Sequence, residues 1–354
     1  MREKLKWVLV IVASMALGGA VVVGIDSTRS DAPRTTTVIN SVSSPAETNV
    51  AASIPDDVAD LYERVRPSVV KITTGNGFAG GVGSGVVIDK EGRILTNNHV
   101  VSGGGDIEVT FADGTTVSAE VLGTDPGSDL AVIDVDVPAG RLQPATLGDS
   151  STVRVGEFVI AIGNPFEIEG TLTQGVVSGI GRTLGGNAGG RPLRQLIQAD
   201  AAINPGNSGG GLFNARGELI GITTAIENPS GDRVFVGIGY AVPVNVAKRF
   251  LPQMIAGQRV DHPRLGVSME NVASGVLIQR VEANSAASRA GLRGGVNGDV
   301  IVGIDDVEVR SHLDLGNYID SKSVGDKVKL RIVRGGSEIT VEVTLEAWPL
   351  NSSA

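Results

Sequence analysis

The sequence predicts a mainly β protein with about two folded domains behind an N-terminal transmembrane helix. Its 354 residues match the size of about two ordinary domains. From residue 69 to residue 242, short runs rich in β-branched residues alternate with Gly, Asp and Asn turns, and no helical pattern interrupts them. Strands that alternate with helices would indicate an α/β sheet, so this pattern favours an all-β domain instead.

The N-terminal helix is predicted by an uncharged apolar stretch from Trp7 to Ile25, which follows a basic end. At ~1.5 Å per residue this stretch spans roughly the thickness of a hydrocarbon core. A cleavable signal peptide is the alternative, with small residues near Ala20 as its cleavage site, but the apolar run continues to Val23. We favour an uncleaved single-pass anchor in the cell membrane over residues 1–25, with its basic end in the cytoplasm and the rest of the chain outside.

Residues 26–55 predict a flexible linker, because they are rich in Ser, Thr, Ala and Pro and contain no aromatic residue. The first folded domain is expected over residues 56–257. It begins with a short helix over 56–65 and closes with a helix over about 245–256. The strands expected between these helices are 69–73, 85–88, 93–96, 107–111, 117–121, 130–135, 158–162, 171–180, 196–199, 219–225 and 234–242.

Ser208 lies in a glycine-rich run, which suits a nucleophile because glycines let backbone N–H groups turn toward a reacting oxygen. A serine hydroxyl also needs an imidazole to remove its proton and a carboxylate to orient that imidazole. The chain has only three histidines; His99 follows a strand-like run, and Asp129 precedes another. The order His99, Asp129, Ser208 is that of chymotrypsin and differs from that of subtilisin and of α/β-hydrolases.

Two other interpretations of the glycine-rich run are open. By itself, the run fits a tight surface turn. It also fits the nucleophile elbow of an α/β-hydrolase, which requires a helix directly after the serine and a catalytic histidine later in the chain. Three consecutive glycines after Ser208 are a poor start for a helix. The later histidines are assigned elsewhere, His262 to a linker and His312 to a second domain, where a surface position is favoured over the border of a binding groove.

Several stretches spread over the middle of the chain together carry a resemblance to one known protein family. They are residues 95–101, 128–132, 161–166, 200–204, 206–210 and 237–243. With these stretches the chain resembles the HtrA/Deg-type serine proteases, which have a trypsin-like domain followed by a PDZ domain. The resemblance implies a chymotrypsin-like double β-barrel, with His99 and Asp129 on the first barrel and Ser208 on the second.

The resemblance also implies the catalytic roles. Ser208 would attack the scissile carbonyl, His99 would act as general base and acid, and Asp129 would hold the tautomer of His99 and stabilise its imidazolium form. Asp134 and Asp136 are alternatives for the carboxylate. Only Asp129 occupies the family's Asp-Leu-Ala position, so we interpret the other two as solvated charges.

The oxyanion hole and the specificity pocket are expected beside the nucleophile. Backbone N–H groups of Gly206 and Ser208 would bind the oxyanion, each contributing about 3 kcal/mol in comparable proteases. Trypsin carries an acidic residue six positions before its nucleophile, whereas this chain has Ala202 there. We therefore expect cleavage after small or medium aliphatic residues. The candidate residues are Gly206, Asn207 and Ser208 for the oxyanion hole and Ala202, Ile203 and Ile238 for the pocket.

A PDZ domain is expected over residues 262–347. Its carboxylate-binding loop would be Leu265, Gly266 and Val267, whose N–H groups would hold the C-terminus of a peptide that adds as a strand. The sequence leaves open whether such peptides are substrates or activators. Further stretches that match the PDZ pattern are 275–278, 286–292, 298–301 and the amphipathic 313–319.

Composition narrows the function. A net charge of -9 argues against a nucleic-acid partner. The absence of cysteine excludes disulfides and thiol catalysis, and we expect no metal and no cofactor. The favoured function is an extracytoplasmic, ATP-independent serine endopeptidase that cleaves misfolded or regulatory proteins in protein quality control and stress response, at the periplasmic or cell-surface side. Expected partners are unfolded or membrane-protein substrates, and the resemblance implies a homotrimer. The alternative is a peptide-binding chaperone or scaffold with an idle protease domain.

Overall fold

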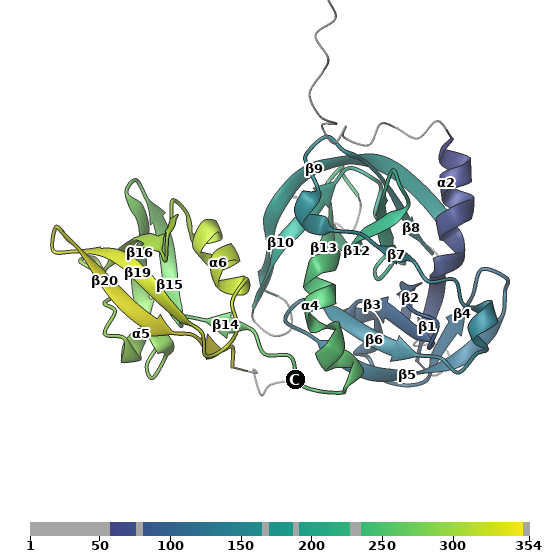
Figure 1. Ribbon diagram of the computed structural model, residues 1–354, viewed down its shortest axis with the longest axis horizontal. Coiled ribbons are helices and arrows are strands. Elements are labelled where there is room, and N and C mark those ends of the chain that lie inside the picture. The colour runs from purple at the N-terminus through teal and green to yellow at the C-terminus, as the bar shows by residue number, and fades with distance from the viewer. Residues whose placement is uncertain (1–56, 76–80, 165–169, 187–190, 227–234, 350–354) are drawn as a thin grey trace, which may run out of the picture. The chain divides into compact units, whose positions relative to one another are not determined.

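The computed structural model describes residues 57–75, 81–164, 170–186, 191–226 and 235–349 (Figure 1). The predicted anchor over 1–25 and the predicted linker over 26–55 lie outside these residues. Within the part of the chain that the structure describes, no helix combines the length and the apolar composition that crossing a membrane requires.

The first barrel follows a short amphipathic helix, α2 (Val58–Val65), whose N-terminus is capped by Asp57. Six antiparallel strands close into a ring in the order β1-β2-β3-β6-β5-β4. Aliphatic side chains fill this ring, among them Ile72, Ile94 and Ile133. A one-turn helix, α3 (Asn98–Val101), follows the third strand. The strands are β1 (Val69–Thr74), β2 (Gly81–Val87), β3 (Arg93–Thr96), β4 (Ile107–Thr110), β5 (Thr116–Asp125) and β6 (Leu130–Asp134).

The second barrel has the strand order β11-β8-β9-β10-β13-β12, and pairing of β11 with β12 closes it. A further short strand, β7, adds to β12 in parallel. Helix α4 (Val244–Ile255) closes the domain with one buried face, in agreement with the predicted helix. The strands are β7 (Thr146–Leu147), β8 (Phe158–Gly163), β9 (Thr171–Gly186), β10 (Pro192–Ala199), β11 (Gly211–Asn214), β12 (Glu218–Ile226) and β13 (Gly239–Pro243); the 3-10 turns are η1 (Arg66–Ser68), η3 (Ala139–Arg141) and η4 (Ser150–Thr152).

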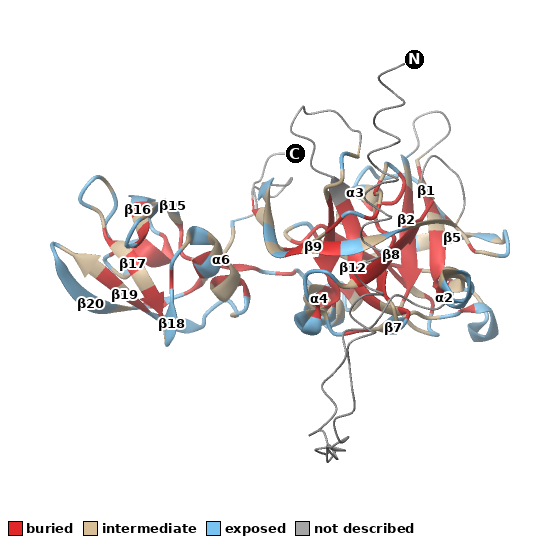
Figure 2. Cartoon of the chain, turned by 90° about the horizontal axis from the view of Figure 1, so that it is seen from above, coloured by how far each residue is buried: buried red, intermediate tan, exposed pale blue. Residues whose placement is uncertain are grey.

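One hydrophobic cluster joins the two barrels. It contains Val86 and Leu95 of the first barrel together with Ile160 and Phe213 of the second. Strands β8 and β12 of the second barrel are buried over most of their described length (Figure 2). The predicted mainly β fold with two six-stranded barrels is confirmed.

The C-terminal part forms a separate sheet with its own core. The order is β15-β16-β17-β19-β20, with β18 paired to β17 and β14 paired to β21. Helix α6, which starts with a capping box from Ser311 to Asp314, corresponds to the predicted amphipathic stretch 313–319. The elements are β14 (Pro263–Arg264), β15 (Val267–Val272), β16 (Gly275–Val281), α5 (Ala286–Arg289), β17 (Val300–Ile304), β18 (Val307–Glu308), α6 (His312–Asp320), β19 (Lys327–Arg334), β20 (Ser337–Thr344) and β21 (Glu346–Ala347).

Asp299 joins three segments of this C-terminal sheet. Its side chain is fully buried, and it accepts hydrogen bonds from Arg334 Nε (2.7 Å), Arg334 Nη2 (2.7 Å) and the Arg293 N–H (2.8 Å). Burial alone would raise the pKa of Asp299, but the bonds from Arg334 and Arg293 outweigh burial, so the pKa lies below its ordinary value.

We predict that Asp299→Asn lowers the free energy of unfolding by about 2 kcal/mol at neutral pH, because the ionised acceptor is lost. A carboxylate whose pKa is depressed in the folded state stabilises the fold fully above its unfolded pKa of ~3.9, and this contribution disappears as pH falls through the lower folded value. The difference between wild type and variant should therefore shrink below pH ~4. Urea unfolding at several pH values measures the difference in unfolding free energy, with the exposed Asp306→Asn as control. A difference that does not change with pH would contradict a stabilising role of the ionised Asp299 carboxylate.

Candidate active site

His99 and Asp129 are brought together by strand pairing in the first barrel. β3 pairs with β6, with Thr96 opposite Ala131, so the residues just after β3 lie beside those just before β6. His99 Nδ1 lies 2.7 Å from Asp129 Oδ2, and the His99 backbone N–H donates to Asp129 Oδ1 (3.0 Å). When Nδ1 carries the proton that bonds the carboxylate, Nε2 is left as the basic nitrogen.

Thr224 on β12 adds a contact from the second barrel that the sequence did not reveal. Its hydroxyl donates to Asp129 Oδ2 (2.6 Å), and its carbonyl accepts from Ser208 Oγ (3.4 Å). The Asp129 side chain is only 9% exposed, and three donors converge on it. Thr224 thus links the carboxylate to the hydroxyl across the two barrels. A threonine within an apolar strand carries no motif, so no signal in the sequence pointed to it.

Ser208 lies in the segment between β10 and β11. Its hydroxyl donates to the Thr224 carbonyl in this conformation, so transfer of its proton to His99 Nε2 requires the Ser208 side chain to turn. The structure therefore brings all three predicted triad residues to one place, with His99 and Asp129 in direct contact and Ser208 joined to them through Thr224.

The backbone around Ser208 has an unusual conformation that glycine permits. Gly206 has φ 100° and Gly209 has φ 85°, both in the left-handed region. The Asn207 N–H donates to the Asn204 carbonyl (2.9 Å). Of the three residues expected in the oxyanion hole, Asn207 thus has its N–H engaged within the chain, and the N–H groups of Gly206 and Ser208 remain the candidates.

Ser84 on β2 anchors this backbone to the first barrel, and the sequence did not single it out. Its N–H donates to the Ser208 carbonyl (2.8 Å), and its hydroxyl donates to the Gly206 carbonyl (2.7 Å). Its carbonyl accepts from Thr96 Oγ1 (2.6 Å), and its hydroxyl oxygen accepts from the Asn164 N–H (2.9 Å). Ser84 therefore fixes the position of the segment on both sides of Asn207.

The three residues expected in the specificity pocket are apolar. Ile203 is buried, whereas Ala202 and Ile238 are partly exposed. A Cβ atom on Gly239 would lie 2.7 Å from Ile203 Cδ1, so the Ile203 side chain packs directly on the start of β13. The Ala202 carbonyl accepts from Thr173 Oγ1 (2.9 Å).

The predicted carboxylate-binding loop lies just before and at the start of β15. Leu265 is buried, and Gly266 has φ 78° and packs so closely on Ser285 that a Cβ atom would lie 2.3 Å from its Cβ. Together with Val267 they border a small hollow that Ile319 of α6 also lines. Among the described residues no group of three His, Cys, Asp or Glu side chains is arranged to hold a metal ion.

These features define a trypsin-like serine protease domain followed by a PDZ domain. Residues 83–222 match the trypsin-like peptidase domain family, and residues 263–345 match the PDZ domain family. The chain is 41% identical over 315 residues to protease Do-like 1, chloroplastic, of Arabidopsis thaliana, covering 82% of this chain and 71% of that protein. It is 39% identical over 292 residues to the periplasmic serine endoprotease DegP of Salmonella typhimurium, covering 77% and 60%.

Solved structures agree with these relatives. The HtrA-type protease AlgW with a tripeptide superimposes with a TM-score of 0.71 at 34% identity, covering 82% of this chain and 97% of that one. AlgW with a decapeptide gives a TM-score of 0.68 at 31% identity, covering 82% and 98%. The chain belongs to the HtrA-type proteases with a PDZ domain, and it is a serine endopeptidase.

We predict that Thr224→Val lowers kcat by roughly tenfold and leaves KM unchanged. The substitution removes a hydrogen bond to a buried carboxylate, and a loss of about 1.4 kcal/mol in the transition state corresponds to a tenfold slower reaction. Steady-state cleavage of a peptide substrate measures both constants. The exposed Thr146→Val on β7 serves as the matched control. An unchanged kcat in Thr224→Val would show that the hydroxyl does not support Asp129.

Proposed function

We propose that the chain is an ATP-independent serine endopeptidase that cleaves misfolded or regulatory proteins outside the cytoplasm through an acyl-enzyme intermediate. The observation that carries the proposal is the set of contacts in which Asp129 holds His99 and Thr224 while the Ser208 hydroxyl reaches the same threonine. These contacts support the proposal because the carboxylate holds the imidazole through Nδ1, which leaves Nε2 free to take the proton of Ser208 once its side chain turns from Thr224.

The chemistry follows in two stages. Ser208 Oγ attacks the scissile carbonyl while His99 Nε2 takes its proton, and Asp129 stabilises the imidazolium that forms. His99 then protonates the leaving amine. In the second stage a water loses a proton to His99 and attacks the acyl-enzyme ester, and His99 returns that proton to Ser208 Oγ as the acyl C–O bond breaks, which frees Ser208 and releases the new carboxyl product. The N–H groups of Gly206 and Ser208 would stabilise both oxyanions, an effect worth about 3 kcal/mol per donor.

The pocket supports a preference for aliphatic residues. Ala202, Ile203 and Ile238 offer no charge that could pair with Lys or Arg, and the packing of Ile203 on β13 limits the space. We therefore propose cleavage after Val, Ala or Leu.

The PDZ domain is proposed to bind C-terminal peptides. Among the described residues, β15 is the terminal strand of the main C-terminal sheet and pairs on one side only, with β16, so an added strand could pair with its other side. Leu265, Gly266 and Val267 would hold the peptide carboxylate through their N–H groups. The AlgW structures with peptides support a peptide ligand here, which would either recruit a substrate or activate the protease.

The proposed setting is the outer face of a cell membrane. The relatives named periplasmic support a place outside the cytoplasm, and the predicted anchor over 1–25 would hold the enzyme at the membrane, where unfolded and membrane proteins are candidate substrates. We include the homotrimer and the role in stress response in the proposal on the strength of the family resemblance.

Covalent labelling tests the nucleophile. We predict that a fluorophosphonate labels the fragment 53–354 and that Ser208→Ala abolishes both labelling and casein cleavage, because only an activated serine reacts with the probe. Gel fluorescence and product analysis measure the two effects. A parent fragment that stays unlabelled, even with C-terminal peptides added, would favour the chaperone or scaffold alternative.

Mass spectrometry of the products from an unfolded substrate tests the pocket. We predict cuts mainly after Val, Ala and Leu, and Ile238→Ala should widen the pocket and move the preference toward larger apolar residues. A majority of cuts after Lys or Arg would refute the proposed specificity.

A further inference from the structure

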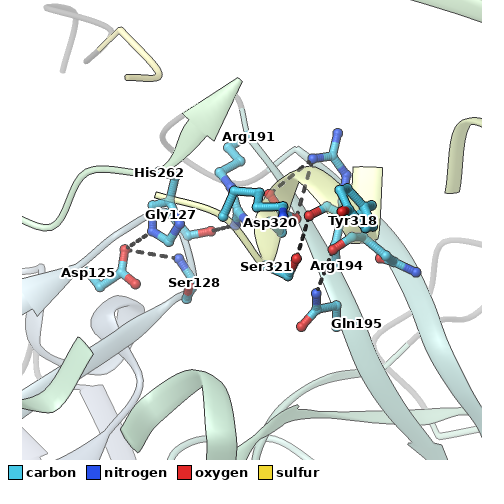
Figure 3. A network of polar contacts seen from close by, with 12 residues as sticks. Asp125, Gly127, Ser128, Arg191, Arg194, Gln195, His262, Tyr318, Asp320 and Ser321 are labelled. Atoms are coloured by element: carbon cyan, nitrogen blue, oxygen red, sulfur yellow. Dashed lines mark hydrogen bonds and ion pairs between the residues drawn. The ribbon is translucent and has the colours of Figure 1, made fainter. Parts of the chain in front are cut away.

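The linker between α4 and β14 contains a buried histidine with a carboxylate partner in the protease domain. His262 Nε2 lies 2.7 Å from Asp125 Oδ1, and the two side chains are 6% and 1% exposed. Figure 3 shows this contact beside Gly127 and Ser128. Asp125 is the last residue of β5 and begins the short turn that ends at Asp129.

The backbone of this turn needs support from outside. Asp129 has φ 55°, a left-handed conformation that a residue with a side chain rarely adopts. The backbone bonds that close the turn are long, with the Ser128 N–H 3.3 Å from the Asp125 carbonyl and the Asp129 N–H 3.4 Å from the Pro126 carbonyl. Such a conformation persists where surrounding contacts determine it, and it fixes the direction of the Asp129 carboxylate.

Asp125 supplies part of that support, and His262 holds Asp125. The Asp125 Oδ1 atom accepts from the Ser128 N–H (3.2 Å) as well as from His262, whereas Oδ2 is buried and has no hydrogen-bond partner among the described residues. A buried carboxylate is stable only when it is paired. His262 is therefore the side chain on which the position of this carboxylate depends.

The imidazole of His262 also packs directly on the turn. A Cβ atom on Gly127 would lie 2.5 Å from His262 Cδ2 and 2.7 Å from its Nε2. On another side the ring meets Phe250 of α4 edge to face, with the centroids 4.8 Å apart. Arg191 Nη1 donates to the Gly127 carbonyl (2.6 Å), and Arg191 in turn pairs with Asp320. The linker and the residue before β10 thus hold the turn together.

We propose that His262 is a positioning residue for the protease. By holding Asp125 and packing on Gly127, it fixes the turn that carries Asp129, and so it sets how well Asp129 orients His99. The inference rests on the proposed roles of His99, Asp129 and Ser208. It gives the linker a part in positioning the carboxylate that orients His99.

Three substitutions of the whole enzyme test this proposal. His262→Phe keeps the ring and its contact with Phe250 but removes the donor, and we expect kcat per fluorophosphonate-titrated site to fall about tenfold with KM unchanged. His262→Gln retains an N–H donor and should restore most of kcat. The exposed neighbour Asp261, which pairs with Arg259, provides the control Asp261→Asn, with no change expected.

Two further measurements keep the test decisive. Gly127→Ala displaces the imidazole without changing His262, and we expect it to lower kcat by a similar factor. This variant therefore tests the same contact even if His262→Phe folds poorly. In a Ser208→Ala background, the low-field proton resonance of the bond between His99 and Asp129 should shift or broaden in His262→Phe and return in His262→Gln. A purely structural role would lower the melting temperature but leave this resonance in place.

The outcomes separate the two proposals. Absence of labelling in the wild type would reject the proposed function, while the proton resonance would still report on His262 because it needs no turnover. If the wild type is active and His262→Phe and Gly127→Ala keep kcat per titrated site within twofold with an unchanged resonance, the positioning role of His262 is rejected.

Discussion

The hydrogen-bonded contact between His99 and Asp129 is the interaction on which the rest of the site depends. It exists because β3 and β6 are paired, so that the helical turn after one strand meets the turn before the other. A base on the first barrel is useful only if a nucleophile on the second barrel lies within reach. The hydrophobic cluster shared by the barrels keeps them together, and the hydrogen bonds of Ser84 and Thr224 fix the fine alignment.

The site is held by short polar contacts between residues far apart in the sequence. Thr224 and Asp129 are 95 residues apart, Ser84 and Gly206 are 122 apart, and His262 and Asp125 are 137 apart. Each contact joins a barrel strand or the linker to the turn that carries Asp129 or to the segment that carries Ser208. Because such hydrogen bonds weaken when donor and acceptor move apart by a few tenths of an ångström, the catalytic geometry depends on the packing of the whole protease domain and its linker.

The sequence was enough to predict the mainly β fold and the three residues His99, Asp129 and Ser208, which the structure brings together. With three histidines in the chain, the order of His99, Asp129 and Ser208 left few alternatives, and the glycines around Ser208 marked the backbone that must turn. The sequence did not predict Ser84 or Thr224, and it assigned His262 to a linker, because a single polar residue has no local pattern. The short strands β7 and β11 were also missed, because two to four residues are too few to show an alternating pattern and their pairing with β12 and β8 defines them.

A crystal structure of the fluorophosphonate adduct would show whether Ser208 is the nucleophile and whether Asp129 holds His99 beside it. We predict phosphorus bonded to Ser208 Oγ and a phosphoryl oxygen within hydrogen-bond distance of the Gly206 and Ser208 N–H groups. His99 should still be hydrogen-bonded to Asp129, and Asp129 to Thr224. An adduct on another residue, or one in which His99 has left Asp129, would contradict this prediction.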